Sequence, residues 1–261
     1  AWNRPIDASE DAALGAYLTD RETGAQDWIT FQRKAPEDAA ALGARLDLPA
    51  SGQVYLLAAN VAWDARLHYP ASAYGHMIDW ALDTVRWFAE HPDRTLIIRC
   101  HPGEVVSSPR AKDRLDTAIM AAFPDLPANV RVIPPEDDTN TYALAQLSAG
   151  VLVFNTTLGM EMAARGKSVL VAGDAWIRGK GFSKDATSPA HYHALLADPE
   201  TFEPLTGDMQ DRARRYAYHF FFRRCIPLAA IDTASGWPLA SLREDAFNLT
   251  HPGKDAGLDI V

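Results

Sequence analysis

Two short motifs place phosphate-binding side chains directly after apolar, strand-like runs. The sequence NTT at 155–157 follows the run VLVF, and His101 follows the run TLIIRC. Hydroxyls, an imidazole and the unpaired N–H groups at a helix start are donors that hold phosphate in proteins. The same residues also fit a capped helix and a loop histidine without a role. Their position after buried strands favours a site for a nucleoside mono- or diphosphate.

Further polar residues follow the same pattern. Arg99 precedes His101 by two positions and supports it, Gly159 allows close approach to a ligand, and Glu161 is placed to pair with a ribose hydroxyl. Arg178 and Lys180 lie between glycines in a loop that we expect to close over the ligand. The candidate donor-binding residues are Asn60, Arg99, His101, Glu104, Asn155, Thr156, Thr157, Gly159, Glu161, Gly173, Arg178 and Lys180.

Two residues are candidates for a catalytic role. Asp64 lies in a long loop after a strand-like run, where it fits a general base or a ligand of an acceptor hydroxyl, and equally a helix cap or a solvent-facing carboxylate. His101 is the second candidate, as a donor of a hydrogen bond or a charge to a phosphate.

Several other chemistries lack their motifs. The chain has neither a GxGxxG fingerprint nor a Walker A loop, which disfavours hydride transfer and ATP hydrolysis. The pairs His191/His193 and Asp137/Asp138 lack a convergent third ligand, so we expect no metal site and no cofactor. No serine lies in a nucleophile elbow. The net charge of -9 argues against a duplex nucleic-acid partner.

The elements that must position these residues alternate regularly between strands and helices. The strand-like runs are residues 54–59, 95–100, 130–133, 151–155 and 167–173. The helical patterns are residues 77–89, 111–123, 141–147, the segment after 155, 188–197 and 208–222. Near-continuous apolar strands between amphipathic helices are typical of a parallel sheet covered on both faces. We therefore predict an α/β, Rossmann-like doubly wound sheet of about five or six strands, with the ligand at the carboxyl ends of its strands.

Composition and length fit a globular protein with three parts. Of 261 residues, 48% are hydrophobic and 23% are charged. We expect a helical N-terminal segment at 1–50, the Rossmann-like domain at 51–235 and a polar tail at 236–261. Cys100 and Cys225 do not make a disulfide framework, which favours a reducing, cytoplasmic setting. No apolar run approaches the roughly 20 residues of a membrane span.

Three blocks of the chain resemble the carboxyl-terminal half of capsule polysaccharide biosynthesis proteins, glycosyltransferases of the GT-B type. The blocks are NVAWDAR, IDWALDTVRWFAEHPDRTLIIRCHPGE and VRVIPPEDDTNTYALAQLSAGVLVFNTTLGMEMAARGKSVLVAGDAWIRGKGFS. They lie in the family's order between Val54 and Tyr192. The chain has Asn-Thr-Thr where many relatives have Asn-Ser-Thr, which keeps a hydroxyl at the changed position.

The resemblance implies a nucleotide-sugar donor, with its phosphate held by His101-Pro102 and Thr156-Thr157. It implies transfer to a polysaccharide or glycolipid acceptor, with no metal required. It also implies work in the cytoplasm, including at the inner face of the inner membrane beside a membrane assembly. About fifty residues precede the first strand, too few for a second Rossmann domain, so we expect the acceptor domain outside this chain. Whether the base is Asp64 or a residue of that domain stays open.

Two alternatives remain open from the sequence. One is a nucleotide-sugar 2-epimerase on the same fold, which requires acid and base carboxylates in one cleft. The other is a domain that binds a nucleotide sugar without turnover. No motif in the sequence identifies the donor sugar, the nucleotide or the acceptor.

Overall fold

A six-stranded parallel sheet forms the centre of the protein in the computed structural model, which describes residues 2–24, 38–49, 53–63, 72–106, 111–233 and 240–260. The strand order is β3-β2-β1-β4-β5-β6, the order of a Rossmann-like sheet. The strands are β1 (Gln53–Ala58), β2 (Arg94–Arg99), β3 (Val130–Ile133), β4 (Gly150–Val153), β5 (Val169–Val171) and β6 (Lys184–Asp185). The predicted α/β, Rossmann-like parallel sheet is confirmed.

Both faces of the sheet are buried, as the near-continuous apolar strands predict. Along β1, Val54 and Leu56 belong to one hydrophobic cluster, whereas Tyr55 and Leu57 belong to the other. Successive side chains of a strand point to opposite faces, so the central residues of a doubly covered strand are mostly apolar. The sheet therefore separates two cores.

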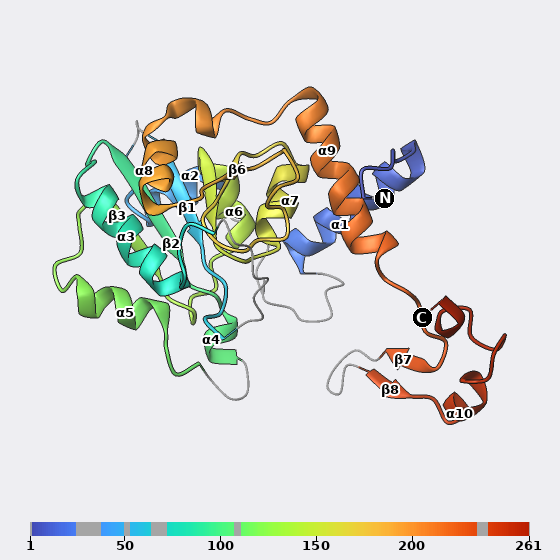
Figure 1. Cartoon of the computed structure of the whole chain (residues 1–261). Helices are drawn as coiled ribbons and strands as arrows, with labels where there is room; N and C mark the ends of the chain where they lie inside the picture. The colour runs from blue at the N-terminus through green and yellow to red at the C-terminus, as the bar shows by residue number, and fades with distance from the viewer. Residues whose placement is uncertain are drawn as a thin grey trace.

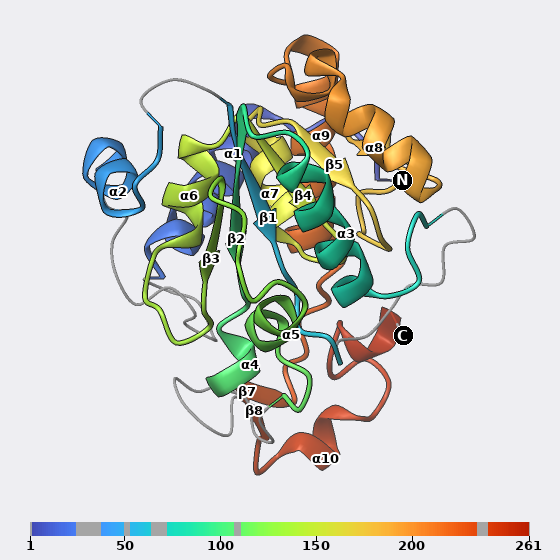
Figure 2. The same ribbon diagram turned by 90° about the vertical axis from the view of Figure 1, so that its left-hand side faces the viewer.

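Helices from different parts of the chain cover the two faces (Figures 1 and 2). One face packs against α1 (Ala8–Thr23), α2 (Ala39–Arg45), α6 (Thr141–Leu147), α7 (Leu158–Ala164) and α9 (Gly207–Tyr218). The other packs against α3 (Met77–Ala89), α5 (Leu115–Ala122), α8 (Pro189–Ala197) and the 3₁₀-helix η1 (Pro199–Phe202). The four-residue helix α4 (Gly103–Val106) follows β2 directly.

The N-terminal segment folds as helices within the described residues. Helix α1 begins at a capping box in which the Asp7 carboxylate accepts from the backbone N–H groups of Ser9 and Glu10, and it ends at Gly24 in a left-handed conformation (φ 68°). It packs against α9. The division of the chain at residues 50 and 235 stays a prediction. Helix α1 nevertheless packs on the same face of the sheet as α9.

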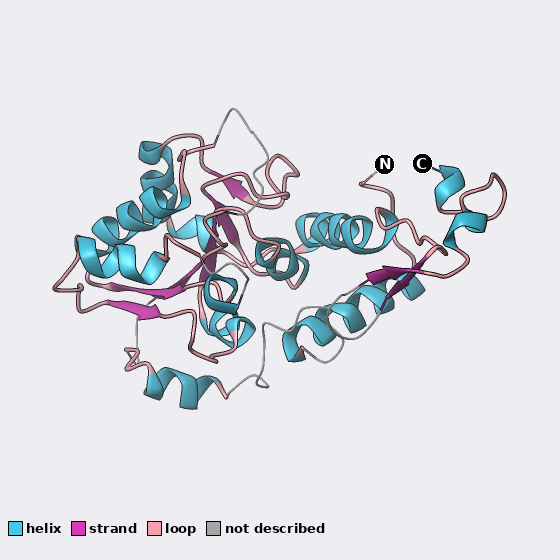
Figure 3. Ribbon diagram, turned by 90° about the horizontal axis from the view of Figure 1, so that it is seen from below, coloured by secondary structure: helices cyan, strands magenta, loops and turns pink. Residues whose placement is uncertain are grey.

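The chain after α9 contains structure that the sequence did not indicate. The helix continues as one π-helical turn, η2 (His219–Arg223), through the aromatic run. An antiparallel hairpin follows, β7 (Ile231–Thr233) with β8 (Ala240–Leu242), then α10 (Ala246–Leu249) and η3 (Leu258–Ile260). Figures 1 and 3 show this hairpin and α10 at one end of the molecule, away from the sheet. Among the described helices, none combines the length and apolarity of a membrane span.

Candidate functional site

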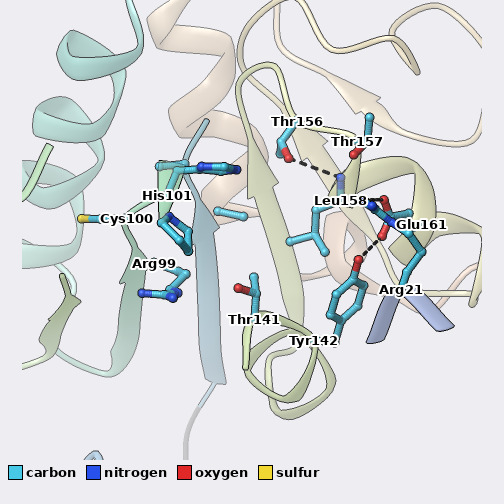
Figure 4. A pocket seen from close by; sticks show the side chains of 13 residues that line it. Arg21, Arg99, Cys100, His101, Thr141, Tyr142, Thr156, Thr157, Leu158 and Glu161 are labelled. Carbon is cyan, nitrogen blue, oxygen red and sulfur yellow. Dashed lines mark hydrogen bonds and ion pairs between the residues drawn. The ribbon is translucent and has the colours of Figure 1, made fainter. Parts of the chain in front are cut away.

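A cavity of about 160 Å³ lies at the carboxyl ends of β1, β2 and β4. Its wall consists of residues from the ends of β1 and β2, the start of α6, the turn from β4 into α7, helix α7 and the last turn of α1. In Figure 4, Arg99 and His101 lie on one side, opposite Thr156, Thr157 and Leu158. In a doubly wound sheet the ligand crevice forms at this edge, where the strand order reverses between β1 and β4.

Arg99, the last residue of β2, brings a buried positive charge to the cavity. Its side chain is 2% exposed, and its two Nη groups donate to the carbonyl oxygens of Pro134 (2.7 Å) and Asp137 (2.8 Å). Its Nε has no hydrogen-bond partner among the described residues. Burial lowers the pKa of the guanidinium, an effect that the nearby Asp137 opposes. Arg99 therefore supplies a fixed positive charge to the cavity wall.

His101 lines the cavity as a neutral imidazole. Burial and the neighbouring Arg99 charge lower its pKa to about 4. The backbone N–H of Gly103 donates to its Nδ1 (2.9 Å), so the neutral ring carries its proton on Nε2. A Cβ on Gly103 would lie 2.7 Å from that Nδ1, so glycine is what lets the ring fold back onto the turn. The motif therefore positions a hydrogen-bond donor, not a charge.

Thr156 and Thr157 form the opposite side of the cavity. The Thr156 hydroxyl accepts from the backbone N–H of Leu158 (3.3 Å), the first residue of α7. The Thr157 hydroxyl has no hydrogen-bond partner within the described part of the chain and is partly exposed. Helix α7 has seven residues, so its start offers hydroxyls and a few N–H groups rather than the dipole of a long helix.

Glu161 lines the same cavity but is fully buried, which differs from the predicted role at a ribose hydroxyl. Its carboxylate accepts from the Tyr142 hydroxyl and forms an ion pair with Arg21 (3.1 Å). A carboxylate with no exposed surface and two donors of its own orients its neighbours instead of contacting a ligand. Sequence reasoning missed Arg21, Thr141 and Tyr142, all of which line the cavity.

Asn60 and Asn155 lie next to the cavity but do not line it. The Asn60 side chain accepts from the backbone N–H of Asn155 (3.2 Å) and donates to the carbonyl of Val61 (2.9 Å). Both residues are buried. They join the end of β1 to the end of β4, and neither lines the cavity.

Glu104 points away from the cavity, toward the start of α5. Its Oε1 accepts from the backbone N–H of Leu115 (3.3 Å), and its Oε2 has no partner among the described residues. The side chain is fully buried, and burial raises its pKa to about 7. The structure thus gives Glu104 a place in the packing of α4 and α5, not in the cavity wall.

Two glycines of the predicted site serve packing. A Cβ on Gly159 would lie 3.2 to 3.3 Å from side chains of Val153, Val169 and Ile177, so this glycine lets α7 approach the sheet. A Cβ on Gly173 would lie 2.5 Å from the Phe154 ring. Close approach occurs at both positions, but to protein and not to the cavity.

The loop after β5 does not bring its cations to the cavity. Arg178 is 5% exposed, and its guanidinium donates to the carbonyls of Gly173 (2.7 Å), Ala186 (2.9 Å) and Val171 (3.2 Å). The Lys180 ammonium lies 5.6 Å from the centre of the Tyr216 ring. Sequence position suggested a closing loop, whereas backbone carbonyls and an aromatic face hold these two side chains elsewhere. Asp64 lies outside the described residues.

The described residues contain no cluster of three or more His, Cys, Asp or Glu side chains that could hold a metal ion. The charged groups of the cavity wall are Arg21, Arg99 and Glu161. Their formal sum is positive in a chain whose net charge is -9. Charge and donors therefore converge locally on a site that suits an anion.

The fold and the cavity define a Rossmann-like α/β protein with a positively charged site at the carboxyl edge of its sheet. Residues 24–209 match the family described as capsule polysaccharide biosynthesis protein, a match that covers more than two thirds of the chain. The chain belongs to this family. A comparison with curated protein sequences finds no significant match.

Solved structures with a similar arrangement include three carbohydrate-related enzymes. KpsC of Thermosulfurimonas dismutans, described as a beta Kdo 2,4 transferase, is 15% identical over 93% of this chain and 63% of its own, with a TM-score of 0.46. The UDP-GlcNAc 2-epimerase of Neisseria meningitidis is 16% identical over 71% and 46%, with a TM-score of 0.43. The wall teichoic acid polymerase TagF is 11% identical over 82% and 44%, with a TM-score of 0.41. This chain thus spans 44 to 63% of these structures.

Proposed function

We propose that the protein is the donor-binding part of a glycosyltransferase that transfers a sugar from a nucleotide sugar to a growing capsule or surface polysaccharide. Membership of the capsule polysaccharide biosynthesis family supports the biological role. One observation carries the site: the Arg99 charge, the His101 imidazole and the hydroxyls of Thr156 and Thr157 line one cavity. The imidazole and the hydroxyls can donate hydrogen bonds to a phosphate, and the Arg99 charge attracts it.

The size of the cavity fits part of such a donor. Small-molecule pockets span about 300 to 1,000 Å³, and this cavity has about 160 Å³. In the proposal it holds a phosphate and the group beside it, while the rest of the nucleotide sugar lies over its open side. The acceptor, a polysaccharide or glycolipid, approaches from that side.

The chemistry of the proposed site is stabilisation of the leaving group. As the bond between sugar and phosphate breaks, negative charge grows on the phosphate oxygens, and preorganised donors stabilise that charge most. Arg99 is held by two carbonyls and the His101 ring by Gly103, so neither has to reorganise during the reaction. The positive charge comes from arginine, so the proposal requires no metal. Asp64 remains our candidate for the base that deprotonates the acceptor.

One feature disfavours the epimerase alternative. Epimerisation requires an acid and a base in one cleft, and the described wall offers a single carboxylate, Glu161, which Arg21 and Tyr142 already engage. A non-catalytic binding domain uses the same wall as the transferase. Saturable binding of a nucleotide sugar without transfer or hydrolysis, in the presence of candidate acceptors, would identify that case.

The test is calorimetric titration with CMP, UDP, GDP and their sugars, after a thermal-shift screen selects the tightest ligand. His101→Ala should weaken binding of that ligand by about fivefold to tenfold, because it removes one hydrogen bond from the neutral imidazole to a charged phosphate oxygen. His191→Ala is the matched control, since His191 is an exposed residue of α8 outside the cavity. Equal affinity of His101→Ala and the wild type would remove His101 from the site.

A further inference from the structure

Helix α1 extends its last turn to the wall of the cavity. Arg21, one of the last residues of α1, lines the cavity with a side chain that is 21% exposed. Arg99 approaches from the end of β2, and in Figure 4 the two guanidinium groups lie on opposite sides of the cavity. A segment that precedes the sheet in the chain thus contributes a second positive charge to the site.

Several contacts fix this turn of α1 against α6 and α7. Arg165 forms an ion pair with Glu22 (2.8 Å) and donates to the carbonyl of Leu18 (2.7 Å). Asn140 donates to the carbonyl of Glu22 (2.9 Å), and Gln146 donates to the Glu22 carboxylate (2.6 Å). These contacts involve the residues on either side of Arg21. These contacts hold the last turn of α1, and with it the Arg21 guanidinium, in a fixed position at the cavity.

The ion pair with Glu161 orients Arg21 without covering it. One contact joins Arg21 Nη2 to Glu161 Oε1 (3.1 Å), while the second carboxylate oxygen accepts from Tyr142. Glu161 is fully buried, whereas part of Arg21 remains accessible from the cavity. Of this pair, Arg21 is the member that a ligand can reach.

We propose that Arg21 is a ligand-contacting residue that binds a phosphoryl group in the cavity, and that Glu161 is its positioning residue. The proposal rests on the function proposed above and adds a binding residue from the N-terminal helix. A planar guanidinium matches a phosphate with two parallel hydrogen bonds, which an ammonium cannot reproduce. With Arg99 on the other side, the phosphoryl group is held between two positive charges.

The test compares Arg21→Gln with the wild type by calorimetry, using the nucleotide selected above, the corresponding nucleoside and inorganic phosphate. We expect about a tenfold loss of affinity for the nucleotide, no loss for the nucleoside, and a loss for inorganic phosphate. Arg21→Lys should recover only part of the nucleotide affinity, and it serves as the folded variant if Arg21→Gln does not fold. The matched control is Arg86→Gln, because Arg86 is an exposed arginine of α3 outside the cavity, and this variant should change affinity by less than about threefold.

Four outcomes would overturn the role of Arg21. These are unchanged nucleotide affinity in Arg21→Gln, an equal loss for nucleoside and nucleotide, full affinity in Arg21→Lys, or a loss in Arg86→Gln as large as that in Arg21→Gln. Absence of any nucleotide binding by the wild type would instead overturn the proposed function. Arg21 would then be judged by inorganic phosphate, and wild-type failure to bind phosphate would overturn the role of Arg21 as well.

Discussion

Glu104 and His101 are three positions apart, yet their side chains face different surroundings. The His101 ring lines the cavity, whereas the Glu104 carboxyl lies buried at the start of α5. Burial shifts both groups toward their neutral forms, with a pKa of about 4 for His101 and about 7 for Glu104. The motif HPGE therefore combines a hydrogen-bond donor that faces the cavity with a structural carboxyl.

Glu104 makes the stability of the protein depend on pH. Its pKa is about 7 in the folded protein and about 4.3 in an unfolded chain. The folded state binds the proton more tightly, so the stability contributed by Glu104 is full below the unfolded pKa and is lost as pH rises through about 7. Glu104→Gln keeps the acceptor for Leu115 and should be more stable than the wild type at pH 8, by on the order of 2 kcal/mol.

Urea denaturation at pH 5 and pH 8 checks this expectation. The difference between Glu104→Gln and wild type should be larger at pH 8. Glu90→Gln is the control, because Glu90 is exposed. The difference in stability between Glu90→Gln and the wild type should be the same at pH 5 and pH 8. A Glu104→Gln protein that is less stable than the wild type at pH 8 contradicts the expected effect.

At this scale the sequence indicated chemical types better than directions. Arg99, His101, Thr156 and Thr157 were predicted from their positions after strands, and the structure brings them to one cavity. Arg178 was expected in the same place, but its side chain turns back to three backbone carbonyls. Position on the edge of a sheet is set by local pattern, whereas the direction of a long side chain depends on which carbonyls lie near it in space.

Among the elements, the strands and helices of the sheet were predictable because each carries its own local pattern, a continuous apolar run for a strand and apolar residues at helical spacing for a helix. Residues 77–89 and 141–147 were predicted as helices, and α3 and α6 have these bounds. Strand β6 was missed because it has two residues, Lys184 and Asp185, neither of them apolar. The hairpin β7–β8 was missed because its strands have three residues each. These short strands form because they pair with a neighbouring strand, and their own sequences carry no strand pattern.

Glycines at the junctions of elements set how closely the elements pack. Gly173→Ala would bring a Cβ to 2.5 Å from the Phe154 ring after β4, which must then shift within a filled core. We expect a loss of about 1–3 kcal/mol in the free energy of unfolding. Gly15→Ala is the opposite case, because Gly15 lies inside α1 with nothing within 4 Å of its Cβ position. This variant should gain about 0.5–1 kcal/mol.

Chemical denaturation of the two variants beside the wild type measures both changes. We expect the free energy of unfolding to fall in Gly173→Ala and to rise in Gly15→Ala. A general destabilisation by any substitution of glycine with alanine would not give opposite signs. A neutral Gly173→Ala would show that the Phe154 ring has room to move, and the packing role of Gly173 would then be wrong.

On the scale of the whole molecule, the cavity joins segments that are distant in the chain. Arg21 and its partner Glu161 are separated by 140 positions. Sequence periodicity cannot indicate such a pair, because it reports only on neighbours within an element. For that reason the α1 contribution to the site was outside the reach of sequence analysis.

If a ligand contacts Arg21, its binding should stabilise the docking of α1. Hydrogen exchange with mass spectrometry, with and without saturating nucleotide, should show slower exchange of backbone amides in the last turn of α1. Helix α3, which packs on the other face of the sheet, is the internal control. Unchanged exchange throughout α1 in the presence of a bound nucleotide would contradict the coupling.

The attachment of α1 also has a consequence for the order in which the protein folds. Helix α1 is synthesised before the sheet, but its partners lie far along the chain: Glu161 in α7, and Arg214 in α9, which pairs with Asp11 across 203 positions. Contacts of such long range require closure of a large loop and are slow to form. The parallel strands can pair before α1 has a surface to dock on. Recovery of ligand binding during refolding should therefore lag behind recovery of the sheet, so that the ligand reports the final step of assembly.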